Sequence, residues 1–394
     1  MTALPLPLGF RAYVANVGVK DTTDDFTVVA AAGPCAAAGV FTKSSFAGPS
    51  VLVSREHVAS GSARAMVVLS KNANVATGEA GLADAREVVA GVAAALGCAP
   101  ADVLIASTGV IGRRYPMDRI RAGLAAIPTP LPGTDAAAVA RGIMTTDTVP
   151  KTASATVGAV TIVGVAKGVG MIEPDMATMI AMFFTDASLP ASVLDSVFRS
   201  VIDRTFNCVS VDTDTSTSDT AVILASGVAG AVDVDAFTDA LYDVAESLTK
   251  QVARDGEGAT TLIEVAVDGA ATYEQAKRVA KAIVNSPLVK TAVHGADPNW
   301  GRVAMAVGKS TSATEVDQAR VVIRFGSQAA EQEVYPAPLD EAGLAALSQY
   351  MRGDDVRIHV TLAAPGGTRG AASATVWGCD LTDGYVRINA DYTT

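Results

Sequence analysis

A glycine-hinged segment from residue 166 to residue 186 carries the residue types that a self-cleaving chain needs. It reads AKGVGMIEPDMATMIAMFFTD, so a lysine and two glycines precede Glu173-Pro174, and Ala177-Thr178 opens an apolar run. Pro174 fixes its own φ and biases Glu173 toward extended geometry. The small Ala177 leaves its carbonyl accessible to the Thr178 hydroxyl. Attack by this hydroxyl would turn the peptide bond into an ester that water can split.

The product would be a chain that begins with Thr178 and carries both a nucleophile and a base. A hydroxyl is a weak nucleophile at neutral pH, but an adjacent α-amine, which titrates at about 7.7–8.0, can accept its proton. The whole chain has only three histidines, His57, His294 and His359, and so offers few imidazole bases for a conventional triad. An N-terminal threonine therefore suits this sequence better than a triad as the centre of an acyl transfer.

The setting of Ala177-Thr178 is what distinguishes it from an ordinary pair at the start of a buried strand. It resembles the self-cleavage segment of the ornithine acetyltransferases, also called glutamate N-acetyltransferases, whose pattern is K-G-x-G-M-x-x-P-x-M/L-A-T-M. Other stretches similar to this family follow in the same order, namely STGVIG at 107–112, IMTTDT at 143–148, DGEG at 255–258, HGADPNWGR at 294–302 and the C-terminal tail.

The resemblance implies a cut between Ala177 and Thr178, with residues 1–177 as an α subunit and 178–394 as a β subunit that starts with the nucleophile. It implies a mixed-sheet α/β sandwich of the self-processing aminopeptidase and ornithine acetyltransferase type, with the two subunits intertwined in an α2β2 heterotetramer. The implied reaction is a ping-pong transfer of acetyl from N2-acetyl-L-ornithine to L-glutamate in arginine biosynthesis or a related secondary-metabolite pathway. It requires no metal or organic cofactor.

The resemblance also assigns site residues. Thr108 and Gly109 are implied to form the oxyanion hole, where a glycine lets backbone N–H groups approach a ligand closely. The implied substrate-binding residues are Thr145, Lys167, Thr178, Glu257, Asn389 and Thr394. Without the resemblance, the same stretches would be interpreted only as turns, a helix-terminal hydroxyl and solvated charges. The Lys167 ammonium could hold a substrate carboxylate or favour a neutral Thr178 amine.

Two further stretches have no assigned catalytic role. The polar run Ser210–Asp219 has three carboxylates, but it lacks the glycine and distal glutamate of a calcium loop, so a hydrogen-bonded loop near the site is favoured over a metal site. His294, Asn299 and Arg302 lie in a glycine- and proline-punctuated stretch that is interpreted as a loop, and no role is assigned to them.

One departure from the family affects the expected pathway. Arginine-biosynthetic members usually have N-S-G-x-A-N-A-C-T-G, whereas this chain has SKNANVATG at 70–78. That version is similar to the paralogue associated with clavulanic acid gene clusters. Two rival functions also stay open: an amidase or aminopeptidase on the same self-processing fold, and an uncleaved binding or structural protein.

Composition indicates a globular protein that acts on small molecules. In 394 residues, 49% are hydrophobic, which allows a sizeable core, and the net charge of −11 would repel nucleic acid and anionic membranes. The four cysteines, Cys35, Cys98, Cys208 and Cys379, form no C-x-x-C pair, and the start of the chain shows no export signal. These features predict a cytoplasmic enzyme.

The elements expected to position the site alternate between strands and helices, as in an α/β protein. The predicted strands are 66–69, 103–107, 157–165, 221–225, 262–267, 321–325 and 356–362. The predicted helices are 83–95, 136–144, 191–205, 234–253, 273–285 and 341–350. Residues 127–133 are interpreted as a surface connection and 364–370 as a hairpin or loop. Both are too short to link domains, so the chain is expected to form one catalytic body, with or without lobes.

Overall fold

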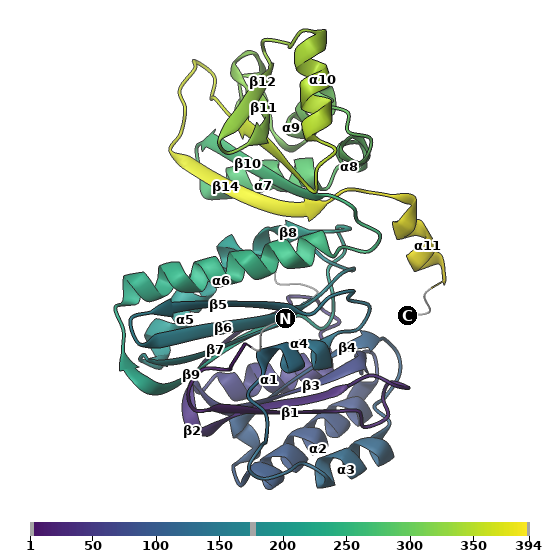
Figure 1. Ribbon diagram of the computed structural model, residues 1–394, viewed down its shortest axis with the longest axis vertical. Helices are drawn as coiled ribbons and strands as arrows, with labels where there is room; N and C mark the ends of the chain where they lie inside the picture. The colour runs from purple at the N-terminus through teal and green to yellow at the C-terminus, as the bar shows by residue number, and fades with distance from the viewer. Residues whose placement is uncertain (1–3, 174–178, 392–394) are drawn as a thin grey trace. The chain divides into compact units, whose positions relative to one another are not determined.

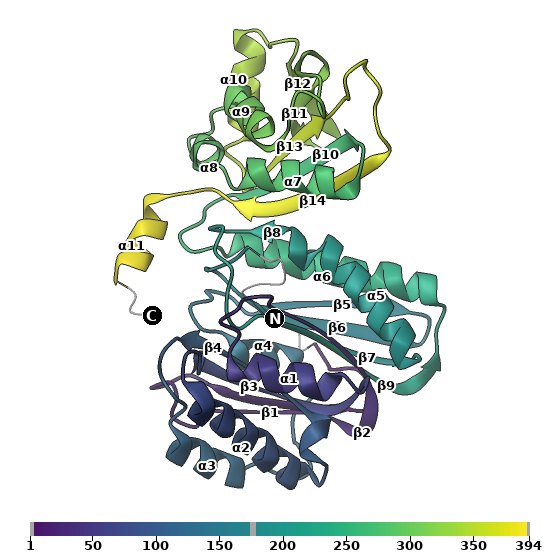
Figure 2. The same cartoon turned by 180° about the vertical axis from the view of Figure 1, so that it is seen from behind.

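A computed structural model describes residues 4–173 and 179–391 of the chain (Figures 1 and 2). Ala177, Thr178 and Thr394 lie outside this range. The described residues form two compact units. Unit 1 comprises 4–173, 179–207 and 214–248, and unit 2 comprises 208–213 and 249–391. The predicted cut falls within the sequence range of unit 1, and the division into subunits at that cut stays a prediction.

The described part of unit 1 is built on an eight-stranded mixed sheet with the order β4-β3-β2-β9-β7-β6-β5 and β1 paired to β2. The strands are β1 (Phe10–Ala15), β2 (Phe26–Phe41), β3 (Ser62–Asn72), β4 (Val103–Val110), β5 (Lys151–Val157), β6 (Val160–Lys167), β7 (Ile180–Ser188) and β9 (Thr220–Ala231). The helices are α1 (Pro49–Val58), α2 (Gly78–Leu96), α3 (Met117–Ala125), α4 (Ala136–Ile143), α5 (Ala191–Arg204) and α6 (Val234–Arg254), whose last residues belong to unit 2.

The sheet of unit 1 is apolar on both faces, which explains why its strands read as continuous hydrophobic runs. In β3, Met66 and Val68 join a core with α4, while the alternate residues Val67 and Leu69 join a second core with α2 and α3. Both views show α2 and α3 side by side beneath β3 and β4 (Figures 1 and 2). On β6, Gly164 lets α6 pack closely, since a Cβ there would lie 2.6 Å from Leu248.

The predicted strand 157–165 is wrong in one respect, because it spans a hairpin. Gly158 has a φ of 59°, so the backbone turns there, β5 ends at Val157 and β6 begins at Val160. The two strands then pair antiparallel, with Lys151 opposite Ala166. This hairpin brings the beginning of β5 next to the end of β6.

Unit 2 contains, among the residues described, a six-stranded mixed sheet with the order β12-β11-β13-β10-β14-β8. Its strands are β8 (Val209–Ser210), β10 (Leu262–Ala270), β11 (Val322–Ser327), β12 (Ala330–Tyr335), β13 (Asp355–Thr361) and β14 (Ala372–Cys379). Its helices are α7 (Tyr273–Val284), α8 (Pro287–His294), α9 (Trp300–Ser310), α10 (Glu341–Tyr350) and α11 (Asp383–Asp391). Helix α7 packs on β10 and β14 and contacts α9.

The loop expected around His294 and Arg302 is a second wrong prediction. His294 ends α8, and Asn299 caps α9 by accepting a hydrogen bond from the Arg302 N–H at 3.2 Å. The glycine, proline and asparagine of this stretch thus end one helix and start another. The α/β class with mixed sheets is confirmed, and none of the helices at positions the structure describes is long and apolar enough to cross a membrane.

Candidate active site

The end of β4 presents Thr108 and Gly109, and Gly109 has a backbone conformation that residues with a Cβ rarely adopt. The sequence predicted that both residues follow the strand, but they lie within it, because β4 pairs with β3 as far as Asn72 and Val110. Gly109 has a φ of 130°, and a Cβ added there would lie 2.2 Å from the carbonyl carbon of Lys71. Thr108 is buried, at 9% exposure. The two strands therefore hold this Thr-Gly pair rigidly, as an oxyanion hole requires.

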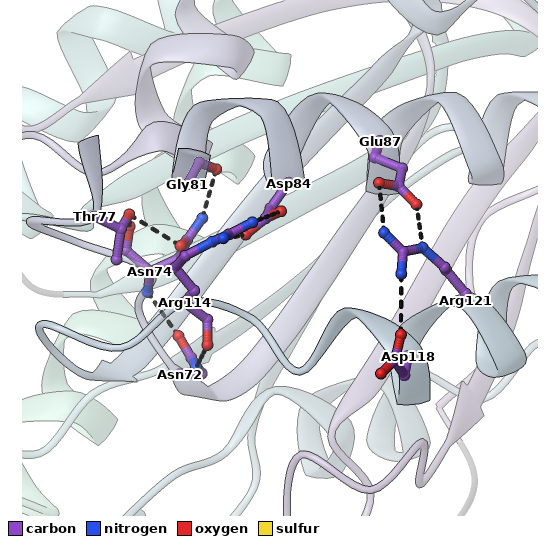
Figure 3. A network of polar contacts seen from close by, with 9 residues as sticks. All are labelled: Asn72, Asn74, Thr77, Gly81, Asp84, Glu87, Arg114, Asp118 and Arg121. Carbon is purple, nitrogen blue, oxygen red and sulfur yellow. Dashed lines mark hydrogen bonds and ion pairs between the residues drawn. The ribbon is translucent and has the colours of Figure 1, made fainter. Parts of the chain in front are cut away.

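The connection between β3 and α2, residues 73–77, packs against the end of β4. The Ala73 N–H donates to the Val110 carbonyl at 3.1 Å, and the Gly112 N–H donates to the Val75 carbonyl at 2.9 Å. Figure 3 shows Asn72, the last residue of β3, together with Asn74 of this connection. The Asn72 side-chain amide donates to the Arg114 carbonyl at 2.9 Å, and Asn74 donates to the Gly81 carbonyl at 2.8 Å.

Arg114, in the loop after β4, makes a bidentate ion pair with Asp84 of α2, at 2.8 and 2.6 Å, which joins this loop to the helix (Figure 3). A second arginine, Arg121 of α3, bridges Glu87 and Asp118 in the same view. These pairs fasten α2 and α3 to each other and to the segment beside the candidate oxyanion hole.

Lys71 adopts a φ of 79°, a conformation that is unfavourable for any residue with a Cβ. Its side chain makes an exposed ion pair with Asp21 at 3.4 Å, and such pairs contribute little stability. Replacing Lys71 by glycine is therefore expected to raise the free energy of unfolding by about 0.5–1 kcal/mol. Relief of strain would gain about 1–2 kcal/mol, and the greater freedom of glycine in the unfolded chain would cost about 0.5–1 kcal/mol.

Urea denaturation of purified protein would measure this difference. Lys71→Ala is the matched control, because it removes the ion pair but keeps the Cβ, and its unfolding free energy is expected to stay near that of the wild type. A Lys71→Gly variant less stable than Lys71→Ala would contradict the strain at this position.

The predicted substrate-binding residues Thr145 and Lys167 lie close together around Asp147. Thr145 follows α4 by two residues, as expected, and its N–H donates to Asp147 Oδ2 at 3.0 Å. Lys167 ends β6, and its Nζ lies 3.8 Å from the same oxygen. Lys167 is 5% exposed, so it is not the solvated lysine that its neighbourhood in the sequence would suggest.

The charges around Asp147 are buried and mutually compensating. The fully buried Lys151 donates from Nζ to Asp147 Oδ1 at 2.8 Å. Burial tends to raise the pKa of the Asp147 carboxyl, but the ammonium groups of Lys167 and Lys151 and the Thr145 N–H outweigh it, so the pKa falls to about 2. Nearby, burial lowers the pKa of Lys20, against the Asp25 carboxylate, and the Lys167 ammonium lowers it further. Asp147 is thus ionised at neutral pH.

In unit 2, the other two described substrate-binding candidates contact each other. Glu257 lies in the turn after α6, and its Oε2 accepts a hydrogen bond from the Asn389 side chain of α11 at 2.9 Å. Gly258 has a φ of 72°, and a Cβ there would lie 2.4 Å from the Tyr385 backbone nitrogen, so the first turn of α11 packs against the D-G-E-G turn. The described part of the tail is therefore an ordered helix. Thr394 lies beyond the described residues.

The polar run Ser210–Asp219 includes a hydrogen-bonded loop in unit 1, as favoured from the sequence. The Glu173 N–H donates to the Asp214 carbonyl at 3.0 Å, and the Thr220 N–H donates to the Met179 carbonyl at 3.0 Å. Glu173 and Met179 are the described residues on either side of the predicted cut, so the residues at 214–220 contact both. Within the described ranges, no cluster of three or more His, Cys, Asp or Glu side chains could hold a metal.

The sequence did not identify the three charged residues that lie around Thr145 and Lys167, namely Asp147, Lys151 and Lys20. Asp147 lies inside the IMTTDT stretch, and Lys151 follows it by four residues at the start of a strand. A carboxylate and a lysine four residues apart beside apolar strands could have indicated a buried ion pair. Their burial, however, depends on three separate segments meeting.

The comparisons with known proteins agree over the whole chain. The ArgJ family model matches residues 11–394. A Nostoc protein named arginine biosynthesis bifunctional protein ArgJ 2 is 55% identical over all of both chains. A Streptomyces clavuligerus protein named glutamate N-acetyltransferase Oat2 is 55% identical over 98% of each chain.

A solved structure, the ArgJ protein of Bacillus halodurans, is 41% identical and covers 52% of this chain and 96% of its own, with a TM-score of 0.47. The family model and the two full-length relatives are enough to assign the family, and this structure adds nothing to the assignment. Together with the motifs and their order, they show that this chain belongs to the ArgJ family.

Proposed function

We propose that this chain is a glutamate N-acetyltransferase that moves an acetyl group from N2-acetyl-L-ornithine to L-glutamate through an acetyl-enzyme on Thr178. The observation that carries the proposal is the full-length similarity to the Streptomyces clavuligerus protein named glutamate N-acetyltransferase Oat2. The intact segment around Ala177-Thr178 and the rigid Thr108-Gly109 pair support it.

Self-cleavage comes first in this proposal. The Thr178 hydroxyl attacks the Ala177 carbonyl, the peptide C–N bond breaks, and water hydrolyses the resulting ester to give fragments 1–177 and 178–394. Strand β6 would then belong to one fragment and β7 to the other, yet they pair along Ile162–Lys167, and β2 likewise pairs with β9. This pairing supports the prediction of two intertwined subunits that stay associated after the cut.

Acetyl transfer then begins with the freed Thr178. Its amine takes the hydroxyl proton while the oxygen attacks the acetyl carbonyl carbon of N-acetylornithine. Thr108 and Gly109 stabilise the oxyanion of the tetrahedral intermediate. The C–N bond to ornithine breaks, the proton passes to the leaving amine, and an acetyl ester remains on Thr178.

The second half-reaction reverses these steps with a different amine. Ornithine leaves, glutamate enters, and its amine attacks the ester carbonyl, which yields N-acetylglutamate and restores the threonine hydroxyl. In this proposal the Lys167 ammonium binds a substrate carboxylate near Thr145. Glu257, Asn389 and Thr394 serve the amine-bearing end of the substrate, since a carboxylate is a strong partner for an ammonium.

Purified protein incubated with N-acetylornithine, with and without glutamate, tests the reaction. N-acetylglutamate is expected only when glutamate is present, with one ornithine released for each acetyl group transferred. Release of free acetate at a rate indifferent to glutamate would identify an amidase instead. A parallel incubation with acetyl-CoA as the only donor would show whether it can replace N-acetylornithine.

Replacing Glu257 by alanine is expected to raise the KM for N-acetylornithine by about tenfold or more, because a hydrogen bond to a charged group contributes about 1.5–3 kcal/mol. Self-cleavage should be unaffected. Steady-state kinetics and a denaturing gel measure the two effects. Asp383→Asn is the matched control, since this exposed carboxylate pairs with Arg387 on α11 and has no proposed role in binding. Unchanged kinetics in Glu257→Ala would remove Glu257 from the site.

The proposal also includes an α2β2 assembly in the cytoplasm. Native mass spectrometry would test the assembly, with two copies of each fragment as the expected result. A single copy of each would limit the enzyme to one αβ pair.

A further inference from the structure

Asp147 is a buried carboxylate that takes no part in the proposed chemistry, yet it contacts the residues that do. Its side chain is inaccessible to solvent. Oδ1 accepts hydrogen bonds from Lys151 Nζ at 2.8 Å and from the Gly168 N–H at 2.7 Å. Oδ2 accepts a hydrogen bond from the Thr145 N–H at 3.0 Å and lies 3.8 Å from Lys167 Nζ. One carboxylate thus joins the backbone at Thr145, the Lys167 ammonium and the first glycine after β6.

The fold explains why these contacts meet at one side chain. Asp147 lies in the connection between α4 and β5, Lys151 begins β5, and Lys167 ends β6. Because β5 and β6 form a hairpin with Lys151 opposite Ala166, the two lysines lie on neighbouring strands at the same end of the hairpin. The carboxylate lies beside this end and receives contacts from all three segments.

The energetics indicate that the carboxylate must stay ionised and in place. Burying a charge is costly unless it is paired and hydrogen-bonded, and here both oxygens accept hydrogen bonds. Lys151 supplies the closest opposite charge, within hydrogen-bonding distance. Lys167 lies farther from Asp147 and forms an ion pair rather than a hydrogen bond with it. Asp147 therefore orients the Lys167 ammonium mainly through electrostatic attraction.

We propose that Asp147 is a positioning residue for the acyl donor, which fixes the Lys167 ammonium and the backbone at Thr145 where the substrate carboxylate binds. This inference rests on the proposed function. Lys151 keeps the buried carboxylate charged, and the hydrogen bond from Gly168 fixes the start of the segment that leads toward Thr178. Asp147 itself touches no reacting atom.

The test must separate positioning from simple charge compensation. Asp147→Asn alone would leave the Lys151 ammonium buried without its carboxylate and could prevent folding. The double variant Asp147→Asn/Lys151→Met removes both charges with little change in volume. If Asp147 only neutralised Lys151, this variant would have a normal KM. Positioning predicts a KM for N-acetylornithine raised about tenfold or more, with kcat within about threefold of the wild type.

A second variant keeps the test decisive if the double variant does not fold. Asp147→Glu keeps the charge that Lys151 needs, but it displaces the carboxylate by one methylene. It is expected to be cleaved and folded, with KM raised at least severalfold. A normal KM in either folded variant would overturn the positioning role.

Asp186→Asn is the matched control. Asp186 is also a buried carboxylate that accepts hydrogen bonds from backbone N–H groups, of Thr161 at 2.7 Å and Leu8 at 3.2 Å. It lies near the opposite end of β6, and these hydrogen bonds within the described residues reach no proposed site residue. Its variant is expected to lose stability without a change in KM. If the wild type itself transferred no acetyl group, the proposed function would fail, whereas an active wild type with unchanged variants would refute only the role of Asp147.

Discussion

Replacing Thr178 by alanine is expected to leave the chain as one continuous polypeptide without acetyl-transfer activity. Alanine has no hydroxyl to attack the preceding carbonyl, so neither the cut nor the acetyl ester can form. Removing the nucleophile of an acyl-transfer enzyme lowers kcat by several orders of magnitude, and a kcat below about 10⁻⁴ of the wild type is expected. Intact-mass analysis together with N-terminal sequencing measures processing, and the N-acetylglutamate assay measures activity.

Thr178→Ser is the matched variant, because it keeps both a hydroxyl and, after cleavage, an α-amine. It is expected to be cut at the same bond and to retain measurable transfer. Active wild-type enzyme that proved to be a single chain would contradict the whole mechanism, since the proposed base exists only after the cut. Processing of Thr178→Ala at the same bond would show that another residue performs the cleavage.

Replacing Gly109 by alanine is expected to have the second largest effect, a loss of about 100-fold or more in kcat. The new Cβ would lie 2.2 Å from the carbonyl carbon of Lys71 and 2.3 Å from its oxygen, and both belong to the backbone of the paired strand. β4 must therefore shift against β3 and carry the oxyanion donors with it. Losing one such donor typically costs about 10²–10³ in kcat.

Gly97→Ala is the matched control. It has the cost of a positive φ in a residue with a Cβ, but it lacks the close contact that a Cβ at Gly109 makes with the Lys71 backbone. Gly97 caps α2 with a φ of 65°, but no atom of residues 4–173 and 179–391 makes a close contact within 4 Å of a Cβ added there. Its variant is expected to lose about 1 kcal/mol of stability with unchanged kcat. A folded Gly109→Ala variant with kcat within about threefold of the wild type would remove this pair from the oxyanion hole.

The fold was predictable where burial is continuous and local signals agree. The runs at 66–69 and 103–106 are apolar at every position, as strands of a sheet covered on both faces need to be. The helix predicted at 136–144 is observed as α4, Ala136–Ile143, and Asp135 caps it. The prediction failed at Gly158 and around Asn299, where glycine, proline and asparagine serve equally well in a loop, a hairpin turn or a helix cap.

The chemistry could be read from the sequence because it is concentrated at one peptide bond. A hydroxyl, a small preceding residue, a proline and flanking glycines act on each other through a few covalent bonds, so their order along the chain is enough to suggest self-cleavage and a threonine nucleophile. The roles of the motifs at 107–112 and 255–258 could be predicted only through their resemblance to a family.

The surroundings of the site were decided by the tertiary structure. Asp147 is buried and contacts Thr145, Lys151 and Gly168 only because the α4–β5 connection, the start of β5 and the end of β6 meet there. Glu257 meets Asn389 across 132 positions of sequence. Hydrogen bonds and ion pairs depend on distances of a few ångströms between remote segments, and those distances are set by how strands pair and helices pack rather than by residue order.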